Sequence, residues 1–200
     1  LDPRAAEKLV NAKTKLIVAV HYAGQPCDMP AIKKIAKKRK LFVIEDAAHA
    51  IGSKYKDGSN VGSCKYSDLT TFSFHPVKNI TTGEGGAITT NNKELYDRLI
   101  MLRTHGITKD PQKMSKTPGP WYYEMQELGF NYRMSDLQAA LGVSQFKKID
   151  RFKQKRRQIV EKYNKAFESL ANITIPFEAE GIDSMFHLYT LLIDFEKIGK

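Results

Sequence analysis

A lysine stands between a segment typical of a β-strand and a glycine-rich turn. Residues 69–74 read LTTFSF, Lys78 follows four positions later, and residues 83–86 read GEGG. A lysine held between a buried strand and a flexible loop can lose its water, and a deprotonated amine is a nucleophile towards a carbonyl. A single lysine in a basic protein is usually a solvated surface residue, so Lys78 alone carries no assignment.

An acidic residue occupies a comparable position one strand earlier. Residues 41–44 (LFVI) form an apolar run of strand length, Asp46 follows them closely, and Lys78 lies 32 positions further on. Ligands of parallel sheets bind at the carboxyl ends of the strands, and the alanines around His49 leave room there. An aspartate that ends a strand often only caps the next helix. Asp46 could therefore be a helix cap or a ligand-binding residue, and the presence of Lys78 after a later strand favours the second interpretation. Asp46 and Lys78 together predict a binding site at one edge of a sheet.

Other chemistries lack their motifs. Residues 83–86 have neither the Gly-Lys-Ser/Thr ending of a P-loop nor the glycine spacing of a dinucleotide fingerprint. No serine nucleophile elbow is present, and the histidines are too scattered for a zinc site, so we predict no metal. A lysine with a carboxylate partner remains. This pair suits a direct Schiff base with a carbonyl substrate, or pyridoxal phosphate (PLP), whose pyridine nitrogen needs an Asp or Arg partner.

The elements that position these residues indicate an α/β protein. Apolar strands without polar alternation, separated by amphipathic helices, predict a mostly parallel sheet with helices on both faces. Asp2 and the Ser135/Gln138 pair are expected to cap helices. The expected helices cover residues 3–10, 28–40, 93–103, 135–141 and 149–170, and the expected strands cover residues 16–20, 41–44, 69–74, 85–90 and 186–193. The last strand has little chain left to pair with, and residues 107–130 are expected to form a long loop.

The composition narrows the class of protein further. With 200 residues, of which 42% are hydrophobic, the chain can bury a core, and no apolar run reaches about eighteen residues, so we expect no membrane span. Only Cys27 and Cys64 are present, which suits a reducing cytoplasm. Much of the net charge of +10 lies in residues 32–40 and 147–157. Solvated helix faces explain it better than a nucleic-acid site, and a basic surface also attracts phosphate-bearing substrates.

Four segments together carry a resemblance to a known family. They are EDAAHAIG at residues 45–52, SFHPVKNI at 73–80, EGG at 84–86 and GFNYRMSDLQAA at 129–140. In this order they resemble the DegT/DnrJ/StrS family of PLP-dependent nucleotide-sugar aminotransferases, and the similarity runs across essentially all 200 residues. Residues 119–128 look most like the subgroup of UDP-4-amino-4,6-dideoxy-N-acetyl-altrosamine transaminases, which serve pseudaminic acid synthesis.

The resemblance implies roles around the cofactor, PLP. Lys78 would carry PLP and then act as the general base of the proton shift, and Asp46 would pair with the pyridine nitrogen. These two are the expected catalytic residues. His49 would lie against the cofactor near its ring oxygen, and Ser73 would bind its phosphate. A subset of the family lacks the lysine and performs dehydration, so the presence of Lys78 favours transamination.

The resemblance also implies partners. The expected reaction moves an amino group from glutamate to a 4-keto-6-deoxyhexose linked to UDP or dTDP, for a cell-surface polysaccharide or glycan. Asn131 would reach the cofactor phosphate of the neighbouring subunit, so a homodimer with shared active sites is expected, and His187 would touch the sugar nucleotide. His49, His75 and His187 also fit packed core histidines. A non-catalytic PLP- or phosphate-binding scaffold of the same fold is the alternative function.

The length of the chain sets the expected domain organisation. Residues 1–147 would form part of an aspartate-aminotransferase-like (fold type I) large domain without its N-terminal portion. Residues 148–200 would form a connecting helix and the start of a small α+β domain. Members of the family are nearly twice as long and this chain begins with Leu1, so we expect a fragment with an incomplete site, unstable or inactive alone.

Overall fold

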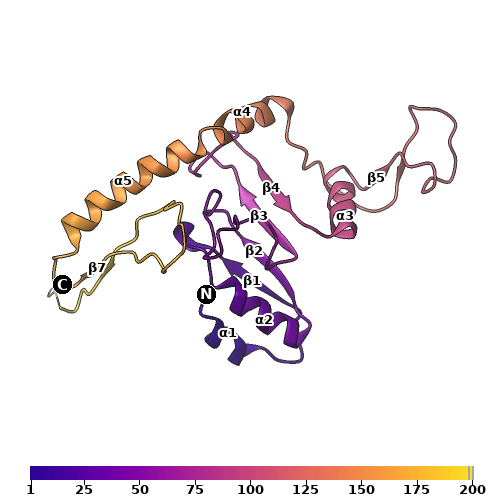
Figure 1. Cartoon of the computed structure of the whole chain (residues 1–200). Helices are drawn as coiled ribbons and strands as arrows, with labels where there is room; N and C mark the ends of the chain where they lie inside the picture. Colours follow the sequence, from indigo (N-terminus) through magenta and orange to yellow (C-terminus); the bar gives the residue numbers. More distant parts are fainter. Residues whose placement is uncertain (198, 200) are drawn as a thin grey trace.

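The computed structural model describes residues 1–197 and Gly199. It has a central sheet with helices, a long helix that leads away from the sheet, and a two-stranded arm on the other side (Figure 1). No helix within the described residues has the length and apolar character needed to cross a membrane.

The central sheet has the strand order β1-β2-β3-β4. Strands β1 (Leu16–Val20), β2 (Phe42–Asp46) and β3 (Leu69–Ser73) run parallel, as the apolar runs predict, whereas β4 (Gly86–Thr89) runs antiparallel to β3. The connection through residues 74–85 consists of turns and contains no helix, whereas a parallel crossover usually runs through an α-helix. The carboxyl ends of β1, β2 and β3 therefore share one edge of the sheet.

Two helices precede and separate the first strands. Helix α1 (Pro3–Leu9) begins after Asp2, whose side chain accepts two backbone N–H groups, as predicted. Helix α2 (Met29–Arg39) has its aliphatic stripe buried while its lysines face solvent. The core that contains this stripe also includes Ile17 and Val43 of the sheet. The basic charge of α2 is therefore the outer face of an amphipathic helix.

The opposite face of the sheet is open in the part of the chain that the structure describes. Along β1, Ile17 and Ala19 are buried whereas Leu16, Val18 and Val20 are exposed. The sequence predicts helices on both faces of the sheet, but within the described residues only one face is covered. An exposed apolar sheet face of this kind needs further protein to cover it.

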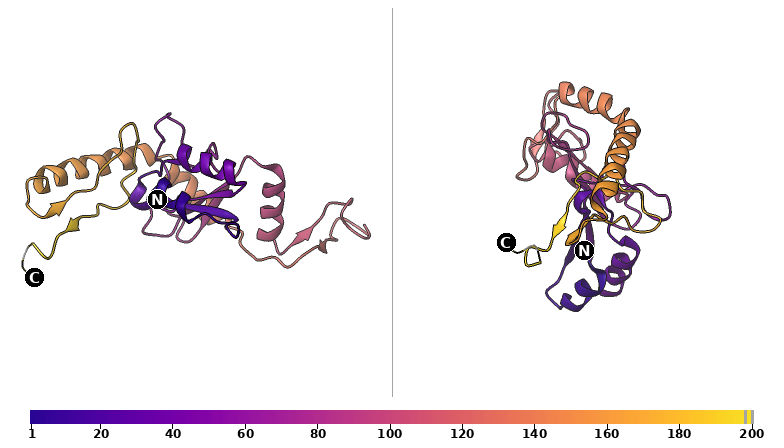
Figure 2. Two further views of the ribbon diagram at one scale, coloured as in Figure 1. Left: turned by 90° about the horizontal axis from the view of Figure 1, so that it is seen from below. Right: turned by 90° about the vertical axis from the view of Figure 1, so that its left-hand side faces the viewer.

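The arm lies within the segment expected to be a long loop. Helix α3 (Lys93–Arg103) leads into β5 (Ile107–Thr108), which pairs with β6 (Glu124–Met125). The arm projects beyond α3 in Figure 1 and in the left-hand view of Figure 2. Helix α4 (Asp136–Phe146) then begins with the predicted capping box of Ser135 and Gln138.

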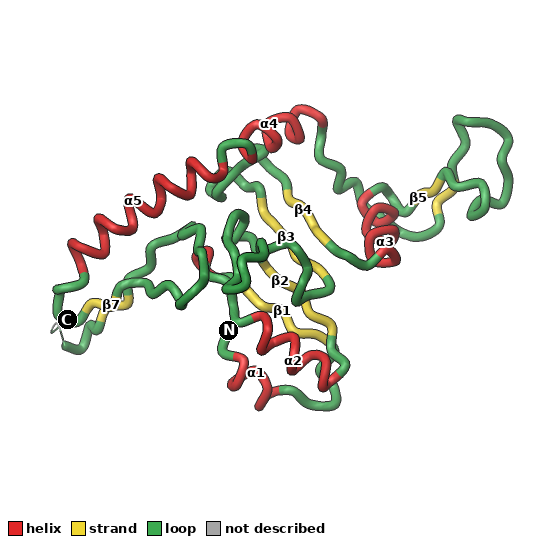
Figure 3. Tube along the Cα trace, viewed as in Figure 1, coloured by secondary structure: helices red, strands yellow, loops and turns green. Residues whose placement is uncertain are grey.

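The last third of the chain is built on one long helix. Helix α5 (Ile149–Phe167) is followed by β7 (Ile173–Thr174) and β8 (Leu192–Ile193), which pair with each other (Figure 3). The prediction of a strand over residues 186–193 is wrong for most of its length, because residues 186–190 turn back towards the central sheet. The predicted domain boundary falls at the bend between α4 and α5 and stays a prediction.

Candidate functional site

Lys78 lies in the turn that follows β3. Its backbone N–H donates to His75 O at 2.9 Å. Lys78 is half-buried, whereas the preceding Val77 is exposed. Thr82 N–H donates to Phe74 O at 3.1 Å and closes the turn. The sequence therefore places the lysine at the rim of the sheet rather than on an open surface.

Asp46 is the last residue of β2 and is half-buried. Its backbone is in register with Val20 of β1 and Thr71 of β3, so it stands in the middle of the parallel edge. Oδ1 accepts the Ala48 N–H at 3.1 Å. Oδ2 has no hydrogen bond among the described residues, so one carboxylate oxygen is available to a ligand.

His49 lies where the charges of Asp46 and Lys78 both act. Burial lowers the pKa of its ring, the positive charge of Lys78 lowers it further, and the negative charge of Asp46 raises it. Because such effects fall off with distance, the structure brings the two predicted catalytic residues to one place. The His49 ring lies between Tyr22, at a centroid distance of 5.9 Å, and His187, at 4.5 Å.

His187 reaches the same place from the far end of the chain. It is 9% exposed, and its Nδ1 lies 3.0 Å from Oδ1 of Asn79, the residue after Lys78. Burial lowers the pKa of His187 to about 4, and any proton gained by His49 and the positive charges of Lys78 and Arg156 act in the same direction. Its ring is therefore neutral at pH 7.

Gly24 lets these segments converge. It is the last residue of the short 3-10 helix η1 (Tyr22–Gly24) and has φ +98°. A Cβ at this position would lie 2.9 Å from Phe186 N, 3.0 Å from His187 N and 3.2 Å from His49 O. Three backbone segments therefore meet where only glycine fits.

The glycine-rich turn packs Ser73 against β4. Ser73 pairs with Gly86 in the sheet, and its Oγ accepts the His75 N–H at 3.4 Å. A Cβ at Gly86 would lie 2.6 Å from Phe72 O, so the close approach of the two strands requires glycine. Ser73 stays half-buried, with its hydroxyl at the mouth of the turn that holds Lys78.

Asn131 is the one predicted site residue that the structure places elsewhere. It is exposed and forms an isolated β-bridge with Thr104, beside the base of the arm. No contact within the described residues brings it to Lys78. Its predicted role at a neighbouring subunit's cofactor is compatible with this exposure and stays a prediction.

A second polar cluster lies in the core and was not predicted. Glu45, next to Asp46, is fully buried, and its carboxylate accepts hydrogen bonds from the hydroxyls of Tyr55, Ser67 and Thr70. Its Oε2 lies 2.7 Å from Nε2 of His21. The alternation of side chains along β2 places Glu45 and Asp46 on opposite faces. The only sequence signal for this difference is the order of the two residues in the strand.

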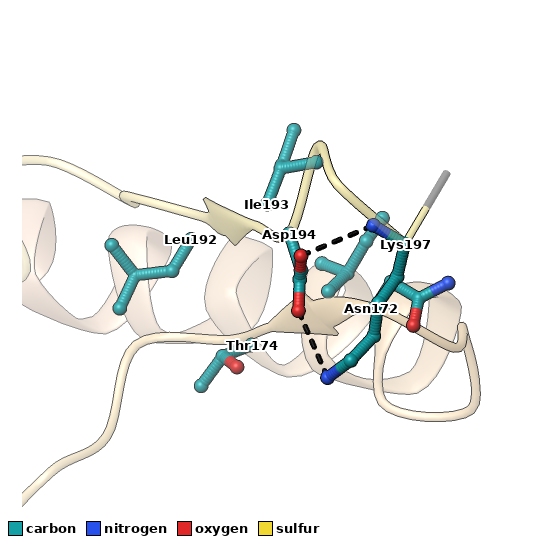
Figure 4. Close-up of a pocket in the computed structure, with 7 residues that line it drawn as sticks. Asn172, Thr174, Leu192, Ile193, Asp194 and Lys197 are labelled. Carbon is teal, nitrogen blue, oxygen red and sulfur yellow. Dashed lines mark hydrogen bonds and ion pairs between the residues drawn. The ribbon is translucent and has the colours of Figure 1, made fainter. Parts of the chain in front are cut away.

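A polar hollow lies beside β7 and β8 (Figure 4). Asp194 and Lys197 form an ion pair of 2.9 Å in it. The hollow shares no residue with the cluster around Lys78, and an ion pair that is closed on itself offers no chemistry to a carbonyl substrate.

Comparison with known proteins agrees with this geometry. The model of the DegT/DnrJ/EryC1/StrS aminotransferase family matches residues 1–200. The chain belongs to this family. A UDP-4-amino-4,6-dideoxy-N-acetyl-β-L-altrosamine transaminase of Campylobacter jejuni is 43% identical over 196 residues, which are 96% of this chain and 49% of the relative.

Solved structures of sugar aminotransferases share the fold. PseC of Helicobacter pylori, an aminotransferase of pseudaminic acid biosynthesis, superposes with a TM-score of 0.89 at 35% identity, over 98% of this chain and 50% of that one. The PLP form of a putative sugar aminotransferase of Streptococcus pneumoniae gives a TM-score of 0.84 at 31% identity, over 97% and 52%. The predicted fold class is confirmed. The chain spans about half the length of the relatives it matches.

The residues of this member of the DegT/DnrJ/EryC1/StrS family fit PLP. The cluster offers an amine at Lys78, a carboxylate oxygen without a partner at Asp46 and a hydroxyl at Ser73. An amine, a carboxylate and a hydroxyl are the groups that an aldehyde, a pyridine nitrogen and a phosphate require. The roles that the resemblance implies for Lys78, Asp46, His49, Ser73 and His187 stay predictions. Asn79 and Gly24, which hold these segments together, were not among the predicted residues.

Proposed function

We propose that the whole protein is a PLP-dependent aminotransferase that moves an amino group from glutamate to the 4-keto carbon of a UDP- or dTDP-linked 6-deoxyhexose. One observation carries the proposal: Asp46 ends β2 and Lys78 lies in the turn after the neighbouring strand β3, so both stand at the carboxyl edge of the parallel strands. The family membership and the names of the relatives support it over a non-catalytic scaffold, which needs neither residue.

Each residue has a role in this reaction. PLP, when bound, serves as the electron sink for a carbanion at the amino-bearing carbon. The free oxygen of Asp46 would hold a proton on the pyridine nitrogen, and Ser73 would donate to the phosphate. Lys78 would anchor the cofactor and later move a proton between carbon atoms through Nζ. His49 would pack beside the ring.

We also propose a homodimer in the cytoplasm that uses nucleotide sugar and glutamate. Asn131 is exposed at the base of the arm, as a residue that serves a neighbouring subunit must be. The arm and the following segment expose large apolar side chains that suit a subunit contact, among them Trp121, Leu128, Tyr132 and Leu137. Cys27 and Cys64 are free and buried, which supports a reducing compartment.

Absorption spectroscopy tests the cofactor site in the full-length protein. Wild type with PLP should show a visible band that differs from that of free PLP, and Lys78→Ala should abolish it. Lys33→Ala, in which an exposed lysine of α2 is replaced, is the matched control and should keep the band. If Lys78→Ala kept the band, the assignment of the lysine would be wrong.

Substrate assays then separate the enzyme from the scaffold. Glutamate should convert bound PLP to its amine form, and the absence of any conversion would favour the scaffold. A panel of UDP- and dTDP-linked 4-keto-6-deoxyhexoses should regenerate PLP with one preferred sugar. The amino sugar named for the Campylobacter relative, supplied with 2-oxoglutarate, tests the same reaction in reverse.

A further inference from the structure

Asn79, the residue after Lys78, has both ends of its side-chain amide paired. It is 5% exposed, its Nδ2 donates to His49 O at 3.1 Å, and its Oδ1 faces Nδ1 of His187 at 3.0 Å. A backbone carbonyl only accepts hydrogen bonds, so the NH₂ end of the amide must face His49. The oxygen end therefore faces His187.

This orientation determines which nitrogen of His187 carries the proton. The amide oxygen of Asn79 only accepts, so Nδ1 must be the protonated nitrogen of the neutral ring. Nε2 then holds a lone pair. Burial and the surrounding positive charges, which lower the pKa of His187 to about 4, keep the ring in this neutral form.

Nε2 of His187 is free to meet a ligand. It has no hydrogen bond among the described residues. The fully enclosed side-chain polar atoms without a partner in that part of the chain belong to Gln25 and Glu127, so Nε2 of His187 is not one of them. Its neighbour His49 has the complementary arrangement, because its Nδ1 accepts the Ala23 N–H at 3.3 Å and leaves the proton of the neutral ring on Nε2. The two rings, 4.5 Å apart, offer one acceptor and one donor.

We propose that Asn79 is a positioning residue that holds His187 with its proton on Nδ1, so that Nε2 accepts a hydrogen bond from a hydroxyl of the sugar nucleotide. The inference rests on the proposed function, which supplies the sugar substrate. A lone pair suits a hydroxyl, which donates, and repels the carboxylates of glutamate, which only accept. Asn79 therefore helps one site to distinguish the two substrates that use it in turn.

Nitrogen NMR of the full-length protein, with ¹⁵N-labelled histidine rings, reads the tautomer without any turnover. The signals that His187→Gln removes identify the ring. We expect a protonated Nδ1 and an unprotonated Nε2 in wild type at pH 7. A proton on Nε2, or on both nitrogens, would overturn the inference. No folded variant of Asn79 is needed for this result.

Asn79→Asp tests the positioning role. A carboxylate against Nδ1 favours a doubly protonated His187, so Nε2 becomes a donor and the NMR signals should change accordingly. We expect the KM for UDP-4-amino-4,6-dideoxy-N-acetyl-β-L-altrosamine to rise about tenfold or more, because a buried acceptor is lost, while the KM for 2-oxoglutarate changes less than about twofold. Equal increases in both KM values would contradict the assignment.

Asn91→Asp is the matched control. Nδ2 of Asn91 also donates to a backbone carbonyl, that of Ser63, at 2.9 Å, but the residue is exposed and has no contact with His187. It should leave both KM values and the NMR signals of His187 unchanged. If no PLP binds or no amino group moves, the proposed function fails while the tautomer stays measurable. If amino transfer occurs with a proton on Nε2 of His187, the inference alone fails.

Discussion

Two buried histidines, His21 and His187, have opposite surroundings. Burial opposes a charge on His21, but hydrogen bonds to Cys27 and Glu45 outweigh it and raise the pKa of His21 to about 9. His187 faces the neutral amide of Asn79, and burial with nearby positive charges lowers its pKa to about 4. The same residue type thus has a raised pKa beside a buried carboxylate in one cluster and a lowered pKa beside a neutral amide in the other.

The adjacent carboxylates of β2 repeat this contrast. Glu45 is fully buried and its oxygens are occupied by protein donors, whereas Asp46 is half-buried and has one oxygen without a partner among the residues that the structure describes. A polar group whose partners all belong to the protein contributes to the fold. A group that keeps an unpaired atom is available for chemistry, which offers a direct way to tell structural from functional residues.

Removal of Glu45 should give the largest loss of stability. Glu45→Ala leaves Nε2 of His21 and three hydroxyls without their buried acceptor, so we expect the free energy of unfolding to fall by about 3–5 kcal/mol. Urea denaturation of the full-length protein measures it. Glu7→Ala, which breaks an exposed pair with Lys38 at 3.4 Å, should cost less than about 1 kcal/mol. If Glu45→Ala and Glu7→Ala lowered the unfolding free energy equally, the buried cluster would contribute no more to stability than a surface ion pair.

Substitution of the neighbouring carboxylate should affect activity instead. Asp46→Asn keeps an acceptor for the Ala48 N–H but loses the charge that holds a proton on the pyridine nitrogen. We expect kcat to fall about 100- to 1000-fold, the range for loss of one electrostatic contact in a transition state. The unfolding free energy should change by less than about 1 kcal/mol. A large loss of stability would assign Asp46 to the fold.

The pH dependence of stability should differ in sign between the two histidines. The pKa of His21 is raised, so its contribution is complete below about pH 6.5, the value for an unfolded histidine, and is lost as the pH rises towards about 9. The loss should be about 3 kcal/mol, read as the difference between wild type and His21→Gln in urea denaturation. Protonation of Nδ1 requires the ring to give up the Cys27 N–H bond of 3.1 Å, so the absence of any difference would show that this bond keeps the ring neutral.

His187 should weaken the fold on the acid side. Its pKa is lowered, so its contribution is present above about pH 6.5 and is lost as the pH falls through about 4. We expect a smaller change, about 2 kcal/mol, because Nε2 is open to solvent and screened. The same denaturation series on His187→Gln isolates it. If the unfolding free energy instead fell on the alkaline side, His187 would pair with an anion as His21 does, and the contrast between the two histidines would be wrong.

The sequence predicts what depends on local pattern. The capping box of Ser135, the cap at Asp2 and the three parallel strands follow from short-range rules, and they place Asp46 and Lys78 at one edge. The antiparallel direction of β4 and the β5–β6 pairing depend on the whole connection, which residue types do not specify.

Contacts between distant segments were beyond the reach of sequence patterns. Asn79 and His187 are 108 positions apart, and nothing in either neighbourhood indicates the other. The difference between Glu45 and Asp46 depends on which face of β2 the core covers. The role of Gly24 could not be predicted, because its need for close packing appears only when residues 49 and 187 are in place.

The separation of Asn79 and His187 has a consequence for the newly made chain. At synthesis rates of about 5–20 residues per second, about 5–20 s pass between Lys78 and His187 leaving the ribosome's catalytic centre. During that interval the nascent chain carries Lys78 without the ring that we propose to accept a sugar hydroxyl. The contact between Asn79 and His187 can form only after both residues have been synthesised, so the positioning of this ring is a late event in the folding of the new chain.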